Sequence, residues 1–325
     1  MKPGQVALVF LTAVIALQGL PARSQDYPSK AITMVVPFTA GGAGDILARI
    51  LGQKLEEKWG KSVVVENKPG AGSVIGAQAV ARAASDGYTL LIAPSSTMAI
   101  NVSLFKNLSY DPVADFTPVA MVAQTVFVLV VNPDLPVHSV AELVAYAKAH
   151  PGLSYATAGP GVPHHLFAEL FKGMTGIDMS PVAYRGSLPG LNDVVAGHVP
   201  LMFVDLGPAL GILKAGKVRP LGVSTKSRVG TLPDVPSIAE SGLPDFDAAS
   251  WQMLVAPAKT PRPVIDQLHQ EVEAILAMPE IKEQIAGNGM VVLPGQSVEK
   301  LQDFVKAEIA RWGKVVQQAG LAGSQ

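Results

Sequence analysis

Apolar runs of strand length alternate with helically spaced segments along this chain, and that alternation limits the fold more than any other feature of the sequence. Near the start, the pattern predicts strands at Ile32 to Val36, Ser62 to Glu66 and Tyr88 to Ala93, separated by helices at Asp45 to Trp59 and Ser73 to Ala84. Strands separated by helices are joined by right-handed crossovers, which place them in a parallel sheet. The first hundred residues are therefore expected to form a doubly wound α/β layer.

Residues at the helix ends carry boundary signals. Gly60 can adopt the left-handed conformation that closes a helix, and Ser73 is expected to cap the helix that follows it. Ser139 with Glu142 forms a capping box. Ser297 begins an amphipathic helix, so its SxxK spacing indicates an N-cap rather than a catalytic motif.

The chain is long enough for two lobes. Its 325 residues suit about two domains of roughly 150 residues each. Val119 to Asn132 is an unusually long apolar run, which we interpret as one strand that crosses into a second domain. Val218 to Ser227 is expected to cross back. We therefore expect lobe I to contain residues 25–122 and 227–325 and lobe II residues 123–226, with a hinge and a cleft between them.

The N-terminal stretch has the composition of an export signal. Val6 to Leu20 is apolar and follows Lys2, but it is too short to span a bilayer comfortably. The sequence ARS places small residues where signal peptidase cuts, so we expect residues 1–24 to be a signal peptide, cleaved near Gln25, and the mature chain to reach the periplasm. A buried first strand or helix is the alternative interpretation of this run.

Charge and composition exclude several classes of function. Without Lys2 and Arg23, 23 basic residues stand against 26 acidic ones, a net charge of about −3 that offers no basic field for nucleic acid or anionic lipid. The chain has no cysteine, which excludes disulfides, thiolate metal sites and thiol nucleophiles. GxSxG, HExxH and Walker sequences do not occur. We expect no enzyme activity, catalytic residue, cofactor or metal, although two carboxylates could still converge in three dimensions.

A glycine-rich segment between the first strand and the first helix marks the candidate binding site. In an open doubly wound sheet, ligands bind at the carboxyl ends of strands where the strand order reverses. Here those ends are the loops Pro37 to Asp45 and Pro94 to Met98. Gly41, Gly42 and Gly44 let the backbone approach a ligand, and the start of the helix adds a partial positive charge that suits a carboxylate.

Two other interpretations of the glycine-rich segment compete with an anion cradle. A nucleotide-binding fingerprint fails, because it requires a third glycine where the chain has Leu47, and because Asp45 would repel a phosphate. A tight turn without a ligand fits the segment equally well, since glycines alone do not distinguish the two.

Several longer segments occur in the order found in one known family. They are YPSKAITMVVPFTAGGAGDILARILGQKLEEKWGKSVVVENKPGAGSVIGAQAVARAASDGYTLLI at Tyr27 to Ile92, YDPVADFTPVA at Tyr110 to Ala120, LPVHSVAELVAYAKAHPGLSYATAG at Leu135 to Gly159, VAYRGSLPGLNDVVAGHVPLMF at Val182 to Phe203 and LPDVPSIAESGLPDFDAASW at Leu232 to Trp251. With EIARWGKVVQQAG near the end, they cover essentially the whole mature chain. The chain resembles the Bug family, the extracytoplasmic substrate-binding proteins of tripartite tricarboxylate transporters.

The resemblance implies a fold, a ligand class and a set of site residues. It implies a Venus-flytrap periplasmic binding protein, a monomer of two α/β lobes that closes on a small carboxylate such as a di- or tricarboxylate, an amino acid or an aromatic acid. In the family, backbone amides and ordered waters of the glycine-rich loop hold one carboxylate. Carried over, the ligand-binding positions are Phe38, Thr39, Ala40, Gly41, Gly42, Asp45, Ser95, Ser96, Thr97, Thr157, Ala158, Gly159, Gly161, His165, Tyr184, Arg185, Gly186 and Asp205.

The resemblance also implies a partner. The receptor would deliver its ligand to the membrane permease subunits of a tripartite tricarboxylate-type transporter. A sensor subunit that presents the ligand to a membrane kinase would use the same closure and is an alternative, and a secreted hydrolase or lyase is a further one.

The chain departs from the family pattern at positions near the ligand. Two prolines are usual at Thr39–Ala40, a Gly-Thr pair at Ala43–Gly44, an Asp-Asn pair at Val204–Asp205 and a serine at His164. These changes bear on the length, charge or polarity of the ligand. His164 and its neighbour His165 point about 100° apart on a helix, which disfavours a shared metal ion.

Structural roles compete with ligand binding at several positions. Arg185 is either a carboxylate clamp or a surface charge. Asp205 either caps the helix that begins at Leu206 or contacts the ligand, and capping is the favoured interpretation. Tyr184 and Trp251 either line the cleft or pack in the core.

Overall fold

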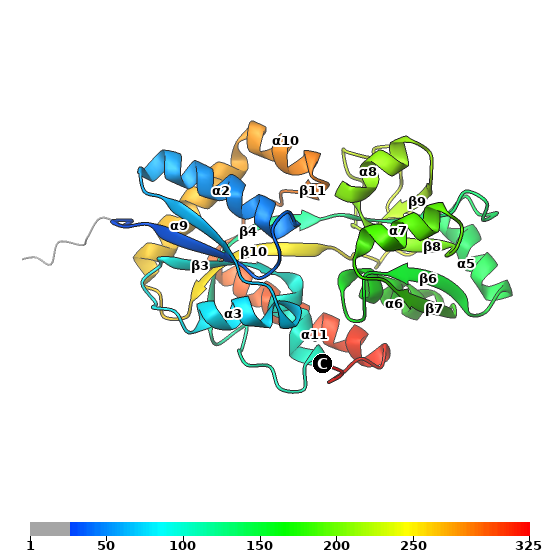
Figure 1. Cartoon of the computed structure of the whole chain (residues 1–325), viewed down its shortest axis with the longest axis horizontal. Coiled ribbons are helices and arrows are strands. Elements are labelled where there is room, and N and C mark those ends of the chain that lie inside the picture. Colours follow the sequence, from blue (N-terminus) through cyan, green and yellow to red (C-terminus); the bar gives the residue numbers. More distant parts are fainter. Residues whose placement is uncertain (1–26) are drawn as a thin grey trace, which may run out of the picture.

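The protein folds into two α/β lobes that lie side by side along its long axis (Figure 1). The computed structural model describes residues 27–325, so the signal peptide expected at residues 1–24 and its cleavage near Gln25 lie outside the described residues. Each lobe is built around one sheet, of six strands in the first lobe and five in the second. The α/β class with two lobes, predicted from the sequence, is confirmed. The residue boundaries expected for the lobes stay a prediction.

The first lobe follows the predicted alternation of strands and helices. Its elements are β1 (Ile32–Val36), α2 (Ala43–Trp59), β2 (Val63–Asn67), η1 (Ala71–Ser73), α3 (Val74–Ala81), β3 (Thr89–Pro94), η2 (Ser96–Ile100), α4 (Asn101–Leu104), β4 (Phe116–Thr125), β10 (Ser250–Pro257), α9 (Arg262–Ala277), α10 (Pro279–Gly287), β11 (Met290–Val291) and α11 (Val298–Gln318). The sheet has the order β11-β4-β10-β3-β1-β2. β1 pairs parallel with β2 and β3, as predicted, but β10 lies antiparallel between β3 and β4, so the whole sheet is mixed.

The second lobe repeats this design on a smaller scale. Its elements are β5 (Phe127–Val131), α5 (Val140–Ala149), β6 (Leu153–Thr157), α6 (Pro163–Thr175), β7 (Met179–Ala183), α7 (Ser187–Val195), β8 (Leu201–Asp205), α8 (Leu206–Lys214) and β9 (Arg219–Val223). The sheet has the order β7-β6-β8-β5-β9, with β6 parallel to β7 and β8. β5, which follows β4 of the first lobe, is antiparallel to both β8 and β9.

The first crossing between the lobes consists of two strands, so the prediction of one strand at Val119 to Asn132 is wrong. β4 ends just before Val126 in the first sheet, and β5 begins just after it in the second. The Val126 amide donates to the Gly289 carbonyl at 3.2 Å, and its carbonyl accepts from the Leu206 amide at 2.9 Å. These partners come from opposite lobes and interrupt the strand. The lobes also approach closely here, since a Cβ on Gly289 would collide with the backbone of Gly207.

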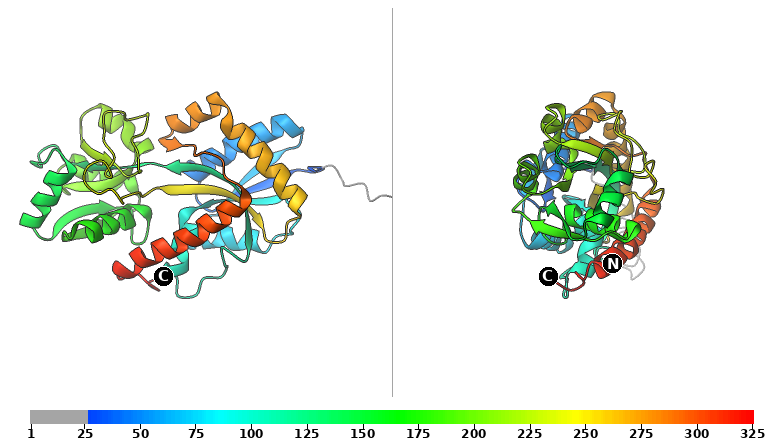
Figure 2. Two further views of the ribbon diagram at one scale, coloured as in Figure 1. Left: turned by 180° about the vertical axis from the view of Figure 1, so that it is seen from behind. Right: turned by 90° about the vertical axis from the view of Figure 1, so that its right-hand side faces the viewer.

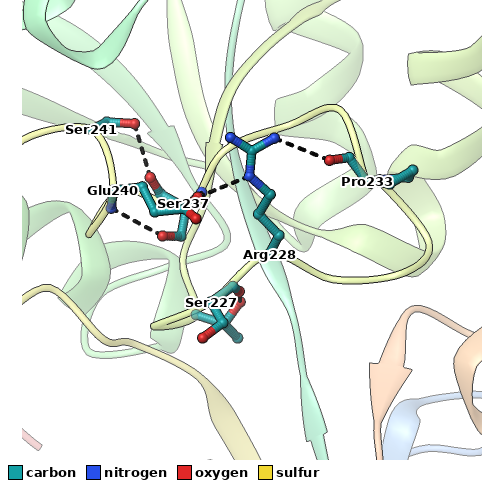
Figure 3. Close-up of polar contacts among 7 residues, drawn as sticks. Ser227, Arg228, Pro233, Ser237, Glu240 and Ser241 are labelled. Atoms are coloured by element: carbon teal, nitrogen blue, oxygen red, sulfur yellow. Dashed lines mark hydrogen bonds and ion pairs between the residues drawn. The ribbon is translucent and has the colours of Figure 1, made fainter.

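The return crossing lies later in the chain than predicted. Val218 to Ser227 does not cross back, because β9 belongs to the second sheet and the chain rejoins the first sheet only at β10. Residues 224–249, between these strands, contain neither a helix nor a strand. Figure 3 shows how side chains hold this segment: Arg228 Nε donates to Glu240 Oε2 at 3.0 Å, and its Nη1 donates to the Pro233 carbonyl at 3.2 Å. Side-chain hydrogen bonds therefore hold the conformation of this irregular segment.

Most of the predicted helix boundaries are confirmed. Gly60 ends α2 in the left-handed conformation, with φ 61°. The hydroxyls of Ser139 and Ser297 accept the backbone amide hydrogens three residues later, at 3.1 Å and 3.5 Å. The cap predicted at Ser73 is wrong: this residue has φ 82°, and its hydroxyl accepts a hydrogen bond from Thr97 Oγ1 at 2.7 Å instead.

Helix α11 packs against the first lobe and extends to the second, as the view from behind in Figure 2 shows. Glu308 in its middle accepts hydrogen bonds from the indole nitrogens of Trp251 and Trp312, both at 2.9 Å. The Trp312 ring stacks on Phe167 of α6, with centroids 5.5 Å apart. Trp251 therefore belongs to the core, and α11 provides a packed contact between the lobes.

Candidate functional site

Asp45 shapes the loop between β1 and α2. Its Oδ2 accepts the Gly41 amide hydrogen at 3.0 Å, and Arg49 donates to both carboxylate oxygens at 3.0 Å. Asn67 Nδ2 donates to Asp45 Oδ1 at 3.1 Å and to the Phe38 carbonyl at 3.0 Å. The Arg49 hydrogen bonds outweigh burial and hold the pKa of the Asp45 carboxyl below its usual value. The Asp45 carboxylate therefore serves to stabilise the conformation of the loop.

The N-terminus of α2 presents free backbone amides. The first amides of a helix lack intrahelical partners, and the N-cap residue Gly42 supplies no side-chain hydrogen bond to them. Gly41, with φ 88°, adopts the left-handed conformation that glycine tolerates best. This arrangement, with the positive end of the helix dipole behind it, is suited to binding an anion.

A cavity of about 330 Å³ lies between the two lobes, in front of these amides. Its volume falls at the lower end of the range for small-molecule sites, ~300 to 1,000 Å³. The first lobe contributes Phe38, Gly42, Ala43, Gly44, Asp45, Gly72, Pro94, Ser96, Asn101, Leu104, Phe105, Thr125, Ser250, Gln252 and Gln325. The second lobe contributes Phe127, Ala158, Pro160, Gly161, Val162, Pro163, His164 and Asp205.

The structure brings part of the sequence-predicted site to this cavity. The predicted residues that line it are Phe38, Gly42, Asp45, Ser96, Ala158, Gly161 and Asp205. The predicted residues outside the lining are Thr39, Ala40, Gly41, Ser95, Thr97, Thr157, Gly159, His165, Tyr184, Arg185 and Gly186. Several of the second group support the walls from behind.

A buried polar network supports the wall of the first lobe. Thr97 Oγ1 donates to Ser73 Oγ at 2.7 Å, and Tyr110 donates its hydroxyl hydrogen to the Thr97 carbonyl at 2.8 Å. Asn101 Nδ2 donates to the Gly72 carbonyl at 2.9 Å. The network ties the η1 turn to η2, so two loops that border the cavity are held in register.

The loop between β6 and α6 forms the facing wall. Thr157 Oγ1 donates to the Gly159 carbonyl at 3.0 Å, and the Gly161 amide donates to His165 Nδ1 at 3.2 Å. Burial lowers the pKa of His165, which favours the neutral ring that accepts this hydrogen bond. Thr157 and His165 therefore fix the loop conformation.

Tyr184 and Arg185 lie outside the cavity lining. The Tyr184 hydroxyl donates to Asp193 Oδ2 at 2.7 Å. Burial and the neighbouring Asp193 raise the pKa of Tyr184 to about 12, so the hydroxyl keeps its proton. The Arg185 side chain is exposed, and Gly186 precedes α7 as its N-cap.

The two adjacent histidines diverge, as their helical spacing predicts. His164 Nε2 lies 3.2 Å from Asp205 Oδ1 across the cavity wall, whereas His165 faces Gly161. The Asp205 side chain makes no capping hydrogen bond to α8, so the capping interpretation is wrong. Within residues 27–325, no three His, Asp or Glu side chains cluster as a metal site would require.

Residues 47–321 match the family model for the tripartite tricarboxylate transporter family receptor. The chain belongs to this receptor family. BugT of Bordetella pertussis is 35% identical over 320 residues, which cover 97% of this chain and 96% of BugT. The solved structure of R. palustris Rpa4515 with adipate is 40% identical, has a TM-score of 0.80, and covers 91% of this chain and 99% of its own. MatC from Rhodopseudomonas palustris with bound malate is 32% identical, has a TM-score of 0.75, and covers 89% of this chain and 100% of its own.

Receptors of this family bind solutes, and solved relatives include periplasmic binding proteins. The protein is accordingly a solute-binding receptor of a periplasmic family and not an enzyme. None of the helices within residues 27–325 combines the length and apolarity that a membrane span needs.

Sequence reasoning missed a strand that lines part of the candidate site. Ser250 and Gln252 on β10 both line the cavity. Residues two apart on a strand share one face, and these are polar residues in the otherwise apolar stretch SWQMLVAP. That pattern was the available signal for a strand with one face toward a ligand.

Proposed function

We propose that this receptor captures a small carboxylate in the interlobe cavity by closing its lobes, and delivers it to a tripartite tricarboxylate-type permease. The observation that carries the proposal is the N-terminus of α2, where Gly42, Ala43 and Gly44 line a cavity that both lobes enclose. Fixed amide dipoles bind a carboxylate through charge-assisted hydrogen bonds.

Two further observations support the carboxylate and the closure. The relatives Rpa4515 and MatC hold adipate and malate, which are both carboxylates. In this chain, residues of both lobes line one cavity, so a ligand there favours the closed form, the only form that contacts it from both sides. Delivery to a permease is supported by the family of transporter receptors to which the chain belongs. We place the mature protein in the periplasm, as a monomer.

A thermal-shift screen tests carboxylate capture. Adipate, malate, glutamate and benzoate should be compared with compounds of the same carbon skeletons in which every carboxylate is replaced by an uncharged amide group. At ~100 times its Kd, a cognate acid should stabilise the native state by about 2.7 kcal/mol, because it binds only the folded protein. The matched amide should leave the melting temperature unchanged. If amides stabilise as well as acids, or if none of a broad set of acids raises the melting temperature, the proposal is wrong.

A further inference from the structure

The wall of the second lobe places an acidic side chain in the cavity. A second carboxylate on the ligand would need a positively charged or hydrogen-bond-donating group there instead. Asp205 ends β8 and lines the cavity, with 21% of its side chain exposed. Burial raises the pKa of its carboxyl, but His164 and the Ser187 hydroxyl outweigh that effect and lower the pKa below its usual value. Asp205 therefore presents a carboxylate at neutral pH.

His164 lies beside this carboxylate in the cavity lining. Its Nε2 lies 3.2 Å from Asp205 Oδ1, and its Nδ1 is buried without a hydrogen-bond partner among the described residues. The ring meets Phe127 edge to face, with centroids 5.0 Å apart. His164 is thus a polar partner of Oδ1, while the exposed part of the Asp205 side chain lines the cavity where a ligand can reach it.

Apart from His164, no charged side chain of the described cavity lining pairs with Asp205. The other carboxylate, Asp45, already accepts hydrogen bonds from Gly41, Arg49 and Asn67. Among the described residues that line the cavity there is no lysine or arginine. A cation or hydrogen-bond donor supplied by the ligand would satisfy Asp205, whereas a second ligand carboxylate would be repelled by it.

The two ends of the cavity also differ in their backbone donors. Helix α2 begins with Ala43 and Gly44, whose amides are available, whereas α6 begins with Pro163, which has no amide hydrogen. The His165 amide donates to the Val162 carbonyl at 3.0 Å, so His164 alone among the first three residues of α6 keeps an available amide, whereas Ala43 and Gly44 both keep theirs in α2. The first lobe is therefore the better site for the carboxylate, and the second lobe for a donor.

We propose that the ligand is an ω-amino carboxylate, whose carboxylate binds the amides of α2 and whose terminal ammonium binds Asp205. This inference rests on the proposed carboxylate capture and specifies the opposite end of the ligand. Asp205 is then the residue that selects an amino acid of this kind over a dicarboxylate of the same length.

Calorimetric titration of the wild-type protein at neutral pH with matched acids tests the inference. The pairs are γ-aminobutyrate with succinate, δ-aminovalerate with glutarate, and ε-aminocaproate with adipate. In the best-binding pair, the amino acid should bind about tenfold or more tightly than the diacid, because a buried charge pair replaces a charge repulsion. This comparison needs no variant, so it does not depend on the folding of any mutant.

The Asp205→Asn variant tests whether Asp205 causes the preference for the amino acid over the diacid. It should weaken binding of the amino acid by about tenfold or more and leave the diacid unchanged or tighter. Asp86→Asn is the matched control, because Asp86 is ion-paired with Lys30 at 3.1 Å outside the cavity lining, and it should alter neither affinity. Equal or tighter binding of the diacid to wild type, or equal losses for both acids in Asp205→Asn, would overturn the inference while carboxylate capture stands. Failure of every acid to bind would instead reject carboxylate capture, and this inference with it.

Discussion

Replacing Gly42 with phenylalanine should abolish carboxylate binding and leave the protein folded. Gly42 has φ −82°, which any residue can adopt, and a Cβ there would meet only the Thr39 carbonyl oxygen, at 3.8 Å. A ring at this position would fill cavity space and cover the first amides of α2. We expect a loss of affinity on the order of 100-fold or more, ~3 kcal/mol. Calorimetric titration with the cognate acid measures the loss, and thermal unfolding checks the fold.

Gly211→Phe is the matched control for this substitution. Gly211 lies on α8, is exposed and lies outside the cavity lining, and a Cβ added to it would meet no atom within 4 Å. The variant should bind the acid with wild-type affinity. Unchanged affinity in a folded Gly42→Phe protein would show that the α2 amides do not hold the ligand, and an equal loss in both variants would show a general effect of the added ring.

Gly161→Val should weaken binding by opposing closure. Gly161 belongs to the second lobe, and a Cβ on it would lie 2.7 Å from Leu104 Cδ2 and 2.8 Å from Cδ1 in the first lobe. Leu104 is buried, so it has little room to move aside. Because the proposed capture requires the closed form, a penalty on closure should lower the apparent affinity, here by about tenfold or more. Calorimetric titration of the purified variant measures this change.

Two companion variants separate closure from backbone strain. Gly159→Val lies in the same loop at φ 134°, with no atom within 4 Å of its Cβ, so it carries left-handed strain without the interlobe clash. It should bind more tightly than Gly161→Val. Adding Leu104→Ala to Gly161→Val removes the opposing side chain and should recover part of the lost affinity, beyond the effect of Leu104→Ala alone. No recovery, together with equal losses at both glycines, would argue against a steric block of closure.

Local patterns predicted the elements of the fold better than they predicted its crossings. Helix α2, from its start near Asp45 to its end at Gly60, was predictable because apolar spacing and a C-terminal glycine are local signals. The break at Val126 was not predictable, because its cause is hydrogen bonding to Gly289 and Leu206, which are distant in the sequence. β10 follows an irregular segment without alternation, so the sheet could not be completed from the sequence.

The candidate site shows the same difference between local signals, which the sequence reveals, and contacts between distant residues, which it does not. The glycine-rich loop was found because its glycines are close together and precede a helix. The role of Asp45 as the anchor of that loop was hidden, since Asn67 and Gly41 become its partners only in the folded chain. Phe127 joins the cavity through tertiary packing and carries no local sign of ligand contact, whereas the polar residues Ser250 and Gln252 in an apolar stretch were a local signal that could have been used.

The most direct test of carboxylate capture at the α2 N-terminus is a crystal structure of the protein with its tightest-binding acid. We expect a carboxylate oxygen ~2.7 to 3.2 Å from the amide nitrogen of Gly42, Ala43 or Gly44, and the rest of the ligand in contact with the second lobe. An acid whose carboxylate lies away from these amides, or an acid that is held by one lobe alone, would contradict carboxylate capture at the N-terminus of α2.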